Sequence, residues 1–432
     1  MNKKVYVLGG YGLIGSACIH RLVSAGFDVT GVGRSLEKGR RSNDQVKWHA
    51  VDIGTASAAE WKERLRDADI IVNAAGALQD GARDDLNAIH VNSIENITQA
   101  LAGTAVTFIQ VSAAGASEQA STEFMRSKAR GDNVLMNSQL NWHVLRPTLV
   151  ISRDAYGGTA LLRAAAAFPL VNIQIFPDAQ IQTVSIDDLT RAITKAATGL
   201  LPQNTIADIT EEESQGFDEL KMEFRSWLGL KPWCVTLPAP SWSIKLIGLI
   251  ADMFGQLGWR SPLRTTALET LKSGICGNAQ TWKMTGNQNC RSMKETMASM
   301  PATIQERWFA KLYLGLPLAI TVLAIFWLAS GIIGIVSFPT AQDVLTKRGI
   351  SDDLAQLLIL SGIIADITLG AAVLVRKLSR LACIGMITIS AAYIIASLLT
   401  APDLWLDPLG PMIKVIPSIV LTVFTISILE ER

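Results

Sequence analysis

The feature that most constrains the fold of this chain is a stretch of 25 residues without one charged side chain, Leu312–Val336. A helix needs about 20 consecutive apolar residues to cross the hydrocarbon core of a bilayer. Three comparable stretches follow, at Leu354–Val375, Leu381–Ala401 and Leu409–Leu429. The sequence therefore predicts an all-α bundle of four transmembrane helices, at about 312–336, 354–375, 381–401 and 409–429.

Charge divides the chain at the same place. Residues 312–432 carry 7 Lys or Arg and 8 Asp or Glu, whereas residues 1–311 carry 32 and 30. The first part therefore has the composition of a water-soluble domain. The net charge of +1 excludes a strongly basic surface of the kind that binds nucleic acid, so we expect a lipid bilayer as partner and no nucleic acid.

The cysteines and the N-terminus indicate the compartment. Five cysteines are present, an odd number and without C-x-x-C spacing, so neither a disulfide framework nor a metal site is expected. The first apolar run, Val5–Leu8, is too short for a signal peptide. With four spans and Lys and Arg enriched in the loops on one side, we expect a multi-pass membrane protein. The soluble domain and both termini would then be cytoplasmic.

Apolar runs alternate with helical patterns through the first 150 residues or so, which predicts a doubly wound parallel sheet of the Rossmann type. The expected strands are Lys4–Leu8, Val29–Val32, Val46–Val51, Ile70–Val72, Val106–Val111 and Trp142–Leu145. The expected helices are Leu13–Ala25, Ala59–Arg66, Asp84–Leu101 and Ser121–Ser138.

A glycine motif, G-x-x-G-x-x-G over Gly9–Gly15, stands at the first strand-to-helix junction. Glycine permits the tight turn and the close approach of backbone to a pyrophosphate, and the following helix N-terminus offers amide donors to the phosphates. A glycine triplet alone is weak evidence, but this one follows a strand and opens a helix. The expected cofactor contacts here are Gly9, Gly12, Leu13, Ile14 and Gly15.

The residue after the second strand selects between dinucleotides. Where an acid would bind a free ribose hydroxyl, the chain has Arg34, followed by Lys38, Arg40 and Arg41. An arginine at this place suits a 2′-phosphate, so NADP(H) is the preferred cofactor and NAD(H) is possible. The alternative is that these basic residues form a solvated loop.

The order of these motifs resembles the extended and atypical short-chain dehydrogenase/reductases over about residues 1–230, and we expect this domain to span 1–236. The resemblance implies that Asp52 and Ile53 contact adenine, that Ala74, Ala75 and Gly76 line the cofactor, and that Ser112 faces the substrate. Further along, Arg146-Pro147 and the Val184–Leu189 segment match later motifs of the family.

One departure limits the chemistry. The family uses a tyrosine four residues before a lysine on one helix, and here Phe124 precedes Lys128. Lys128 can still bind the nicotinamide ribose, so Ser112 and Lys128 are the candidate catalytic residues, whereas a phenyl ring cannot exchange a proton. Tyr156 is a weaker candidate for the missing acid, and a surface position is the alternative. His90 is expected to be structural.

The charge-poor region, about 306–432, resembles the DoxX-like family of four-helix membrane proteins through Phe326–Gly334 and Asp407–Pro411. Ser330 and Gly334 form a pair of small residues suited to close helix packing. Asp366 is the one acid deep in a span. Either it is functional, as intramembrane acids often are, or it makes a hydrogen bond to a serine or tyrosine of a neighbouring helix.

Residues 237–305 connect the two parts. Trp242–Leu257 is apolar but contains Lys245 and Asp252 and is too short to span a bilayer. It is either an interfacial helix on the membrane surface or a cover that packs on the soluble domain.

Two main functions remain open from the sequence, and a different reaction class, such as epimerisation or dehydration, is a further alternative. The first is a membrane-anchored NAD(P)H-dependent oxidoreductase acting on a lipophilic small molecule, such as a quinone or isoprenoid. The second is a non-catalytic NADPH-binding accessory, assembly or redox-sensing protein of a respiratory or other membrane complex. Here the resemblance is to the reductase-like accessory subunit of respiratory complex I, and Phe124 favours it.

Overall fold

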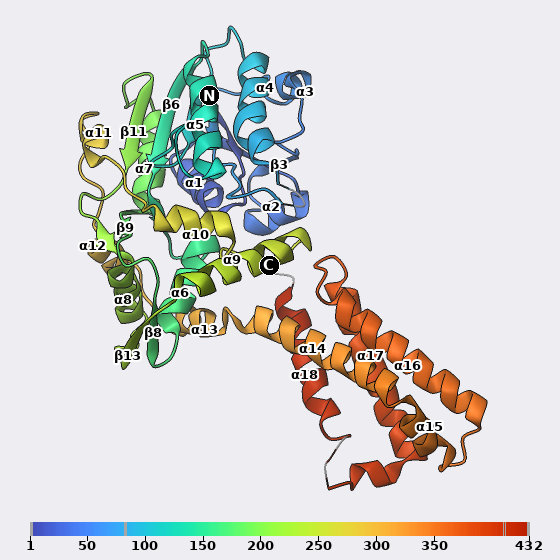
Figure 1. Cartoon of the computed structure of the whole chain (residues 1–432). Coiled ribbons are helices and arrows are strands. Elements are labelled where there is room, and N and C mark those ends of the chain that lie inside the picture. Colours follow the sequence, from blue (N-terminus) through green and yellow to red (C-terminus); the bar gives the residue numbers. More distant parts are fainter. Residues whose placement is uncertain (1–2, 82–83, 409, 411, 430–432) are drawn as a thin grey trace. The chain divides into compact units, whose positions relative to one another are not determined.

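The computed structural model describes residues 3–81, 84–408, 410 and 412–429, which form two compact units (Figure 1). The first, called the head below, consists of Met1–Asp252 and Ser261–Lys311. The second, called the bundle, consists of Met253–Arg260 and Leu312–Arg432.

A seven-stranded sheet, parallel at every pairing, forms the centre of the head, with the order β11-β6-β5-β4-β1-β2-β3. This is the predicted Rossmann-type arrangement, with the order reversing beside β1. The strands are β1 (Lys4–Leu8), β2 (Asp28–Gly33), β3 (Lys47–Ala50), β4 (Ile70–Asn73), β5 (Thr107–Val111), β6 (Asn141–Pro147) and β11 (Thr205–Ile209).

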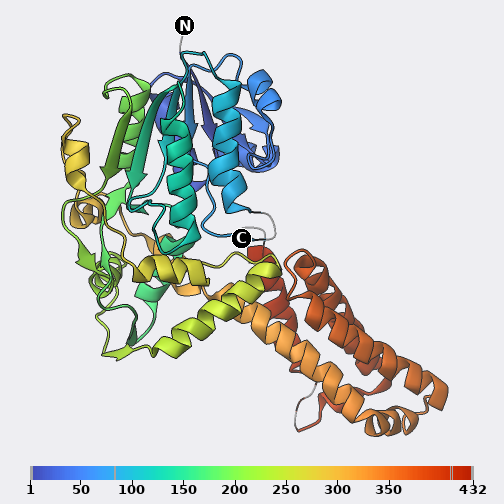
Figure 2. The same cartoon turned by 45° about the horizontal axis from the view of Figure 1, so that its top comes forward.

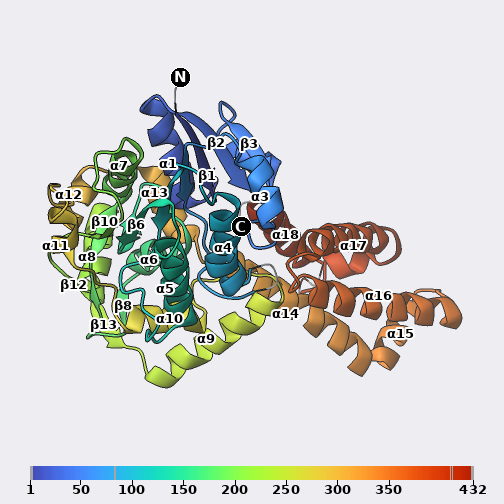
Figure 3. The same ribbon diagram turned by 90° about the horizontal axis from the view of Figure 1, so that it is seen from above.

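Helices cover both faces of this sheet, as the alternating side chains of β1 require. Val5 and Val7 point into a core shared with α1 (Leu13–Ser24) and α7 (Ile186–Ala197), whereas Tyr6 and Leu8 point into a core on the opposite face. That opposite core also receives α3 (Ala58–Arg64), α4 (Ser93–Ala100) and α5 (Glu123–Met136). Figure 3 shows α1 and α7 on one side of the sheet and α4 and α5 on the other.

Three details differ from the sequence-based expectations. The basic segment after Arg34 is a helix, α2 (Leu36–Ser42), because the Ser35 hydroxyl caps it by accepting from the Lys38 N–H at 3.3 Å. The helix expected over 84–101 consists of a π-helical turn, η1 (Ala88–Asn92), followed by α4. The seventh strand, β11, was not predicted.

The rest of the head packs beside the sheet around a third core. Its strand pairs are β7 (Leu149–Ile151) with β10 (Thr183–Ser185), β8 (Val171–Gln174) with β13 (Val235–Pro238), and β9 (Gln180–Ile181) with β12 (Gln215–Gly216). Its helices are α6 (Gly157–Ala167), α8 (Phe217–Trp227), α10 (Thr265–Lys272), α11 (Ala279–Lys283), α12 (Met293–Ala298) and α13 (Ile304–Leu312). Helix α9 (Ser241–Gln256) begins in the head and ends in the bundle.

Four helices make up most of the bundle and lie side by side, orange to red in Figure 2. They are α14 (Gly315–Val336), α16 (Asp352–Ala372), α17 (Ser379–Thr400) and α18 (Val415–Leu429). Helix α15 (Phe338–Thr346) and the 3₁₀ turn η2 (Pro402–Trp405) lie in the connections. At one end Arg348 pairs with Asp403, and at the other Arg376 donates to the carbonyl of Leu429 at 2.7 Å. The chain therefore passes up and down between two ends.

Helices α14 and α16 approach closely because glycines lie at their contact. A Cβ on Gly331 would lie 2.6 Å from Ile367 Cγ1, and one on Gly334 would lie 2.8 Å from Ile363 Cγ1. Beside Gly331 the Ser330 hydroxyl donates to Asp366 at 2.6 Å. The hydrogen bond to a neighbouring helix, one of the two alternatives for Asp366, is present.

The count of long apolar helices in the described residues differs slightly from the four predicted spans. Three helices of the described residues are long and apolar enough to cross a membrane: Ile304–Val336, Asp352–Ala372 and Ser379–Thr400. The fourth predicted span contains α18, whose 15 residues reach only about 22 Å at the usual helical rise, against about 30 Å of hydrocarbon. Gly410 has a φ of +57° and residues 412–414 form a turn, so the helix begins later than composition suggested.

Candidate cofactor site and adjoining pocket

The glycine turn after β1 is packed so tightly that only glycine fits. Gly9 has a φ of +71°, and a Cβ there would lie 2.8 Å from the Cα of Ala75. A Cβ on Gly15 would lie 2.2 Å from the carbonyl oxygen of Gly9. The turn closes where the Gly12 N–H donates to Gly9 at 2.9 Å, and α1 begins at Leu13 without a side-chain cap. The first-turn N–H groups of α1, those of Leu13 and Ile14 among them, are thus placed to serve a bound anion.

Arg34 follows β2 on the same edge of the sheet. Its backbone N–H donates to the Tyr11 hydroxyl at 3.1 Å, and its guanidinium pairs with Asp84 at 2.9 Å. Asp52, after β3, uses its carboxylate to accept from the Gly54 N–H at 3.2 Å. Ile53 is buried in the turn beside it. Arg34 therefore meets both an acid and the glycine turn, where an adenosine end would lie.

The carboxyl ends of β4 and β5 form the next part of the site. Asn73 is buried, donates to Gln110 at 2.9 Å and accepts from the Ala75 N–H at 3.2 Å. This pair holds the chain that runs through Ala74 to Gly76 beside the glycine turn. Sequence motifs far apart in the chain are thereby brought to one edge of the sheet.

Lys128 lies on α5 directly behind this edge. Its ammonium donates to the carbonyl of Val111 at 3.1 Å, and a Cβ on Gly76 would lie 3.3 Å from its Nζ. Burial lowers the pKa of Lys128 to about 8, while the carboxylate of Asp132 opposes that shift. A buried lysine with this pKa changes its charge within the range in which enzymes work.

Ser112 donates its hydroxyl to a carboxylate in the protein interior. The acceptor is Asp132 at 2.8 Å, and the same oxygen accepts two N–H groups of Arg146, at 3.1 and 2.9 Å. The Asp132 side chain has no exposed surface, and its pKa is raised because burial disfavours the charged form. The arrangement fixes the Ser112 hydroxyl toward the protein.

The Phe124 ring packs against a histidine that is itself held by hydrogen bonds. Its ring meets the imidazole of His90 edge-on at 5.8 Å. His90 Nε2 accepts from the Ala77 N–H at 3.3 Å, so the neutral ring carries its proton on Nδ1, which donates to Ser127 at 2.9 Å. Burial lowers the pKa of His90 to about 2, so it stays neutral. Both ring nitrogens therefore make hydrogen bonds within the protein.

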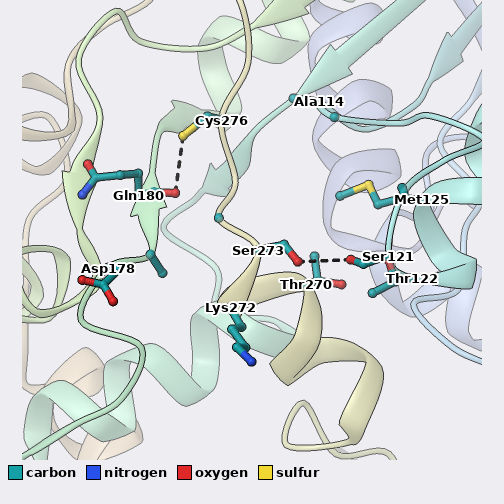
Figure 4. Close-up of a pocket in the computed structure, with 14 residues that line it drawn as sticks. Ala114, Ser121, Thr122, Met125, Asp178, Gln180, Thr270, Lys272, Ser273 and Cys276 are labelled. Atoms are coloured by element: carbon teal, nitrogen blue, oxygen red, sulfur yellow. Dashed lines mark hydrogen bonds between the residues drawn. The ribbon is translucent and has the colours of Figure 1, made fainter.

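A pocket of about 460 Å³ adjoins this region (Figure 4). One wall follows β5 and the start of α5, and includes Ala114 and Met125; the other is made by β9 and by the chain after α10. The two walls meet where the hydroxyls of Ser121 and Ser273 lie 3.1 Å apart. The lining combines apolar groups with polar ones from Asp178, Gln180, Thr270 and Lys272.

Several features of the site were not predicted from the sequence. The chain after α10 was not expected to line a pocket, because no local pattern marks it. Asp132 carried a signal, since it stands four residues after Lys128 and thus on the same helical face. Tyr156 lies at the N-cap of α6 and is 58% exposed, which matches the surface alternative.

Two family models match this chain. Residues 9–173 match an NAD(P)H-binding family and residues 324–423 match the DoxX-like family. The predicted pairing of an NAD(P)-binding Rossmann domain with a DoxX-like membrane domain is confirmed: the chain is a membrane-associated NAD(P)-binding protein of this composite type. No curated protein matches the chain significantly.

Several solved structures with the same fold are described as enzymes in complex with NAD or dependent on it. The enzyme WbmG of Bordetella bronchiseptica, solved with NAD and UDP, gives a TM-score of 0.53 at 14% identity, over 72% of this chain and 97% of WbmG. WbmH of the same organism, solved with NAD⁺, gives 0.51 at 18% identity over 69% and 97%. TunA, an NAD-dependent NDP-hexosamine 5,6-dehydratase of tunicamycin biosynthesis, gives 0.51 at 12% identity over 71% and 97%. At these identities the likeness shows a shared fold alone.

Proposed function

We propose that this protein is a membrane-anchored NAD(P)H-dependent oxidoreductase that acts on a lipophilic small molecule, such as a quinone or an isoprenoid. The observation that carries the proposal is the position of Lys128. Its ammonium lies behind the carboxyl ends of β4 and β5, where Gly76 leaves room beside it. The pocket lining begins close by in the chain, at Ala114 just after β5 and at Met125, which precedes Lys128 on α5.

The chain's residues fit a dinucleotide, because Gly9 and Gly15 keep open a turn that any Cβ would fill. Bound there, the cofactor would supply a hydride. Leu13 and Ile14 would offer N–H groups to its pyrophosphate, Asp52 and Ile53 would bound the adenine, and Ala74 to Gly76 would line its path. Lys128 would hold the nicotinamide ribose by donating to its hydroxyls.

Arg34 would select NADP(H) over NAD(H) by pairing with the 2′-phosphate. Asp84 already holds the guanidinium at this edge, so the phosphate would share it. Replacement of Arg34 by Ala should weaken NADPH binding roughly tenfold, the loss of about 1.4 kcal/mol, and leave NADH binding unchanged. Equal losses for both dinucleotides in a fluorescence titration would contradict the preference.

Lys128 would also replace the proton that the missing tyrosine cannot give. Phe124 has no ionisable group, and Ser112 donates to Asp132. Lys128 and His90 both lie beside Gly76, and of the two only Lys128, with its pKa lowered to about 8, titrates near neutral pH. A quinone suits this site, because its reduction needs a hydride and a proton but no tetrahedral carbonyl chemistry. The 460 Å³ pocket lies within the usual range for small-molecule sites, about 300–1,000 Å³.

The test uses the full chain in detergent or nanodiscs. Oxidation of NADPH is followed at its absorbance, with quinones of increasing tail length. Lys128→Met should retain the fold and abolish turnover, and the matched control Lys62→Met, at an exposed position of α3, should leave it unchanged. Failure of wild type to oxidise NADPH with any quinone or lipid carbonyl would defeat the proposal.

A second function has its own support. Phe124 in place of the tyrosine, together with the engagement of Ser112 by Asp132, favours a non-catalytic NADPH-binding accessory, assembly or redox-sensing role in a respiratory or other membrane complex. In that case wild type would bind NADPH without turnover and co-purify with such a complex. Phe124→Tyr would distinguish the two, because it restores the family's proton donor beside Lys128.

We further propose that the protein resides in the bacterial inner membrane with its head and both termini in the cytoplasm. The hydrogen bond from Arg376 to Leu429 supports this, because it joins the end of α18 to the α16–α17 connection. That connection carries Arg376 and Lys377, and Arg380 follows in the first turn of α17, as expected on the cytoplasmic side. A C-terminal tag that proteases reach only from the periplasm would contradict the topology.

A further inference from the structure

Helix α9 presents an apolar face that the head leaves uncovered. Trp242, Leu246, Leu249 and Met253 recur at intervals of four, three and four residues, so they lie on one side of the helix. Their exposed fractions are 68, 49, 64 and 54%. Soluble proteins seldom expose a continuous apolar stripe of this kind, and such a stripe marks a binding surface.

The opposite side of α9 is fixed to the head. A Cβ on the buried Gly248 would lie 3.3 Å from Leu268 of α10. Asp252 accepts from the Arg264 guanidinium at 2.8 Å and from the Thr265 hydroxyl. The orientation of α9 on the head is therefore set, and the Trp242–Met253 stripe faces away from it.

The chain after α9 belongs to the bundle. Gly258, with a φ of +92°, ends the helix, and the Trp259 N–H donates back to the carbonyl of Phe254 at 3.1 Å. The Trp259 indole then donates to the carbonyl of Leu374 at 2.6 Å, and the N–H of Arg376 donates to Leu257 at 3.0 Å. Residues 257–259 thus pack where α16 ends, at the edge of the predicted span.

We propose that the Trp242–Met253 stripe of α9 lies on the membrane surface, as an in-plane amphipathic helix of the head. The occupant of the apolar face is the lipid bilayer. Along the chain, α9 leads directly into residues 257–259, which pack at the end of a membrane span. Tryptophan is a side chain enriched at the membrane–water interface, and the exposed Lys245 flanks the stripe, where it would meet anionic headgroups.

This surface also concerns the pocket. Helix α9 is bound to the start of α10 through Asp252, and the end of α10 provides Thr270, Lys272 and Ser273 of the pocket lining. Arg264, at the same junction, donates to the carbonyl of Asp80 at 2.8 Å, in the loop that follows β4. The helix on the membrane surface is therefore bound to both the pocket wall and the cofactor edge.

The test places a fluorescent probe on the stripe of the full chain. The two exposed free cysteines, Cys234 and Cys276, are first replaced by serine. Leu246→Cys and Leu249→Cys are then labelled with bimane, and Met222→Cys on α8, 57% exposed, is the matched control. The protein is placed in nanodiscs of phosphatidylethanolamine and phosphatidylglycerol, with or without nitroxide-labelled lipid, and iodide serves as the aqueous quencher.

Quenching by the nitroxide lipid should be at least about threefold stronger at positions 246 and 249 than at 222, because an interfacial helix lies about 5–10 Å deep at the headgroup boundary. Iodide should give the reverse order. Iodide quenching equal to that at 222, without lipid quenching, would show a solvated face and overturn the proposal. Protection from both quenchers would show a protein cover, such as a second copy, and would also overturn it.

Discussion

Each unit of this protein buries a carboxylate, and the two are stabilised differently. Asp132 in the head accepts from Ser112 and twice from Arg146, whereas Asp366 in the bundle accepts from Ser330. In the head, the Arg146 guanidinium and the Ser112 hydroxyl compensate the buried carboxylate at the edge of the candidate cofactor site. In the bundle, Asp366 lies at the glycine-packed contact between α14 and α16 and accepts a hydrogen bond from the Ser330 hydroxyl. The difference indicates that electrostatics organises the first site, and close helix packing organises the second.

The largest effect should follow from Asp132→Ala. Removing one partner of a buried ion pair costs about 3–5 kcal/mol, because the remaining charge loses its compensation. Arg146 would lose its carboxylate and Lys128 its nearest anion. The head's thermal unfolding in the full chain, followed by tryptophan fluorescence, should show a large decrease. Asp44→Ala, at an exposed position, is the control. Equal decreases in unfolding temperature for the two variants would show that the Asp132 ion pair does not stabilise the head.

A packing effect should be next in size, in the bundle. Gly331→Ala places a methyl group 2.6 Å from Ile367 Cγ1, and overpacking of this kind costs about 1–3 kcal/mol. The bundle's resistance to unfolding in detergent should fall. Leu318→Ala, at a position 65% exposed, should have little effect. An unchanged Gly331→Ala variant would mean that the α14–α16 contact is loose.

The third effect concerns pH at the cofactor site. The pKa of Lys128 is lowered to about 8, so the side chain is an ammonium below that pH and loses its charge above it. A charge-assisted hydrogen bond contributes about 1.5–3 kcal/mol, so NADPH affinity should fall roughly tenfold or more as the pH rises above about 8. Fluorescence titration across this range should show the fall in wild type and in the control Lys62→Met. A pH-dependent fall that persists in Lys128→Met would assign it to another group.

The smallest effect should come from Ser330→Ala. Hydrogen bonds between membrane helices contribute about 0.6 kcal/mol on average. Losing the bond to Asp366 should therefore lower bundle stability less than Gly331→Ala does. If Ser330→Ala destabilises the bundle as much as Asp132→Ala destabilises the head, the Ser330–Asp366 hydrogen bond, and not close helix packing, organises the bundle.

Local patterns in the sequence predicted much of this molecule. The first strand was predicted with its observed bounds, Lys4–Leu8, because a short apolar run before a glycine turn has few alternatives. Helix α2 was missed because its apolar contribution comes from Gly39 packing on Trp48, which is a tertiary contact. The shortness of α18 was missed because composition does not reveal the positive φ of Gly410.

The sequence by itself determined that an NAD(P)-binding Rossmann domain precedes a DoxX-like membrane region, because glycine spacing and hydrophobic length are local constraints on the backbone. Only the tertiary structure decided what the polar groups do. It directed the Ser112 hydroxyl to Asp132, brought Lys128 beneath Gly76, and paired Asp366 with Ser330. These partners stand 20, 52 and 36 positions apart in the chain. Local periodicity carries no information on such pairings, since packing selects the partner.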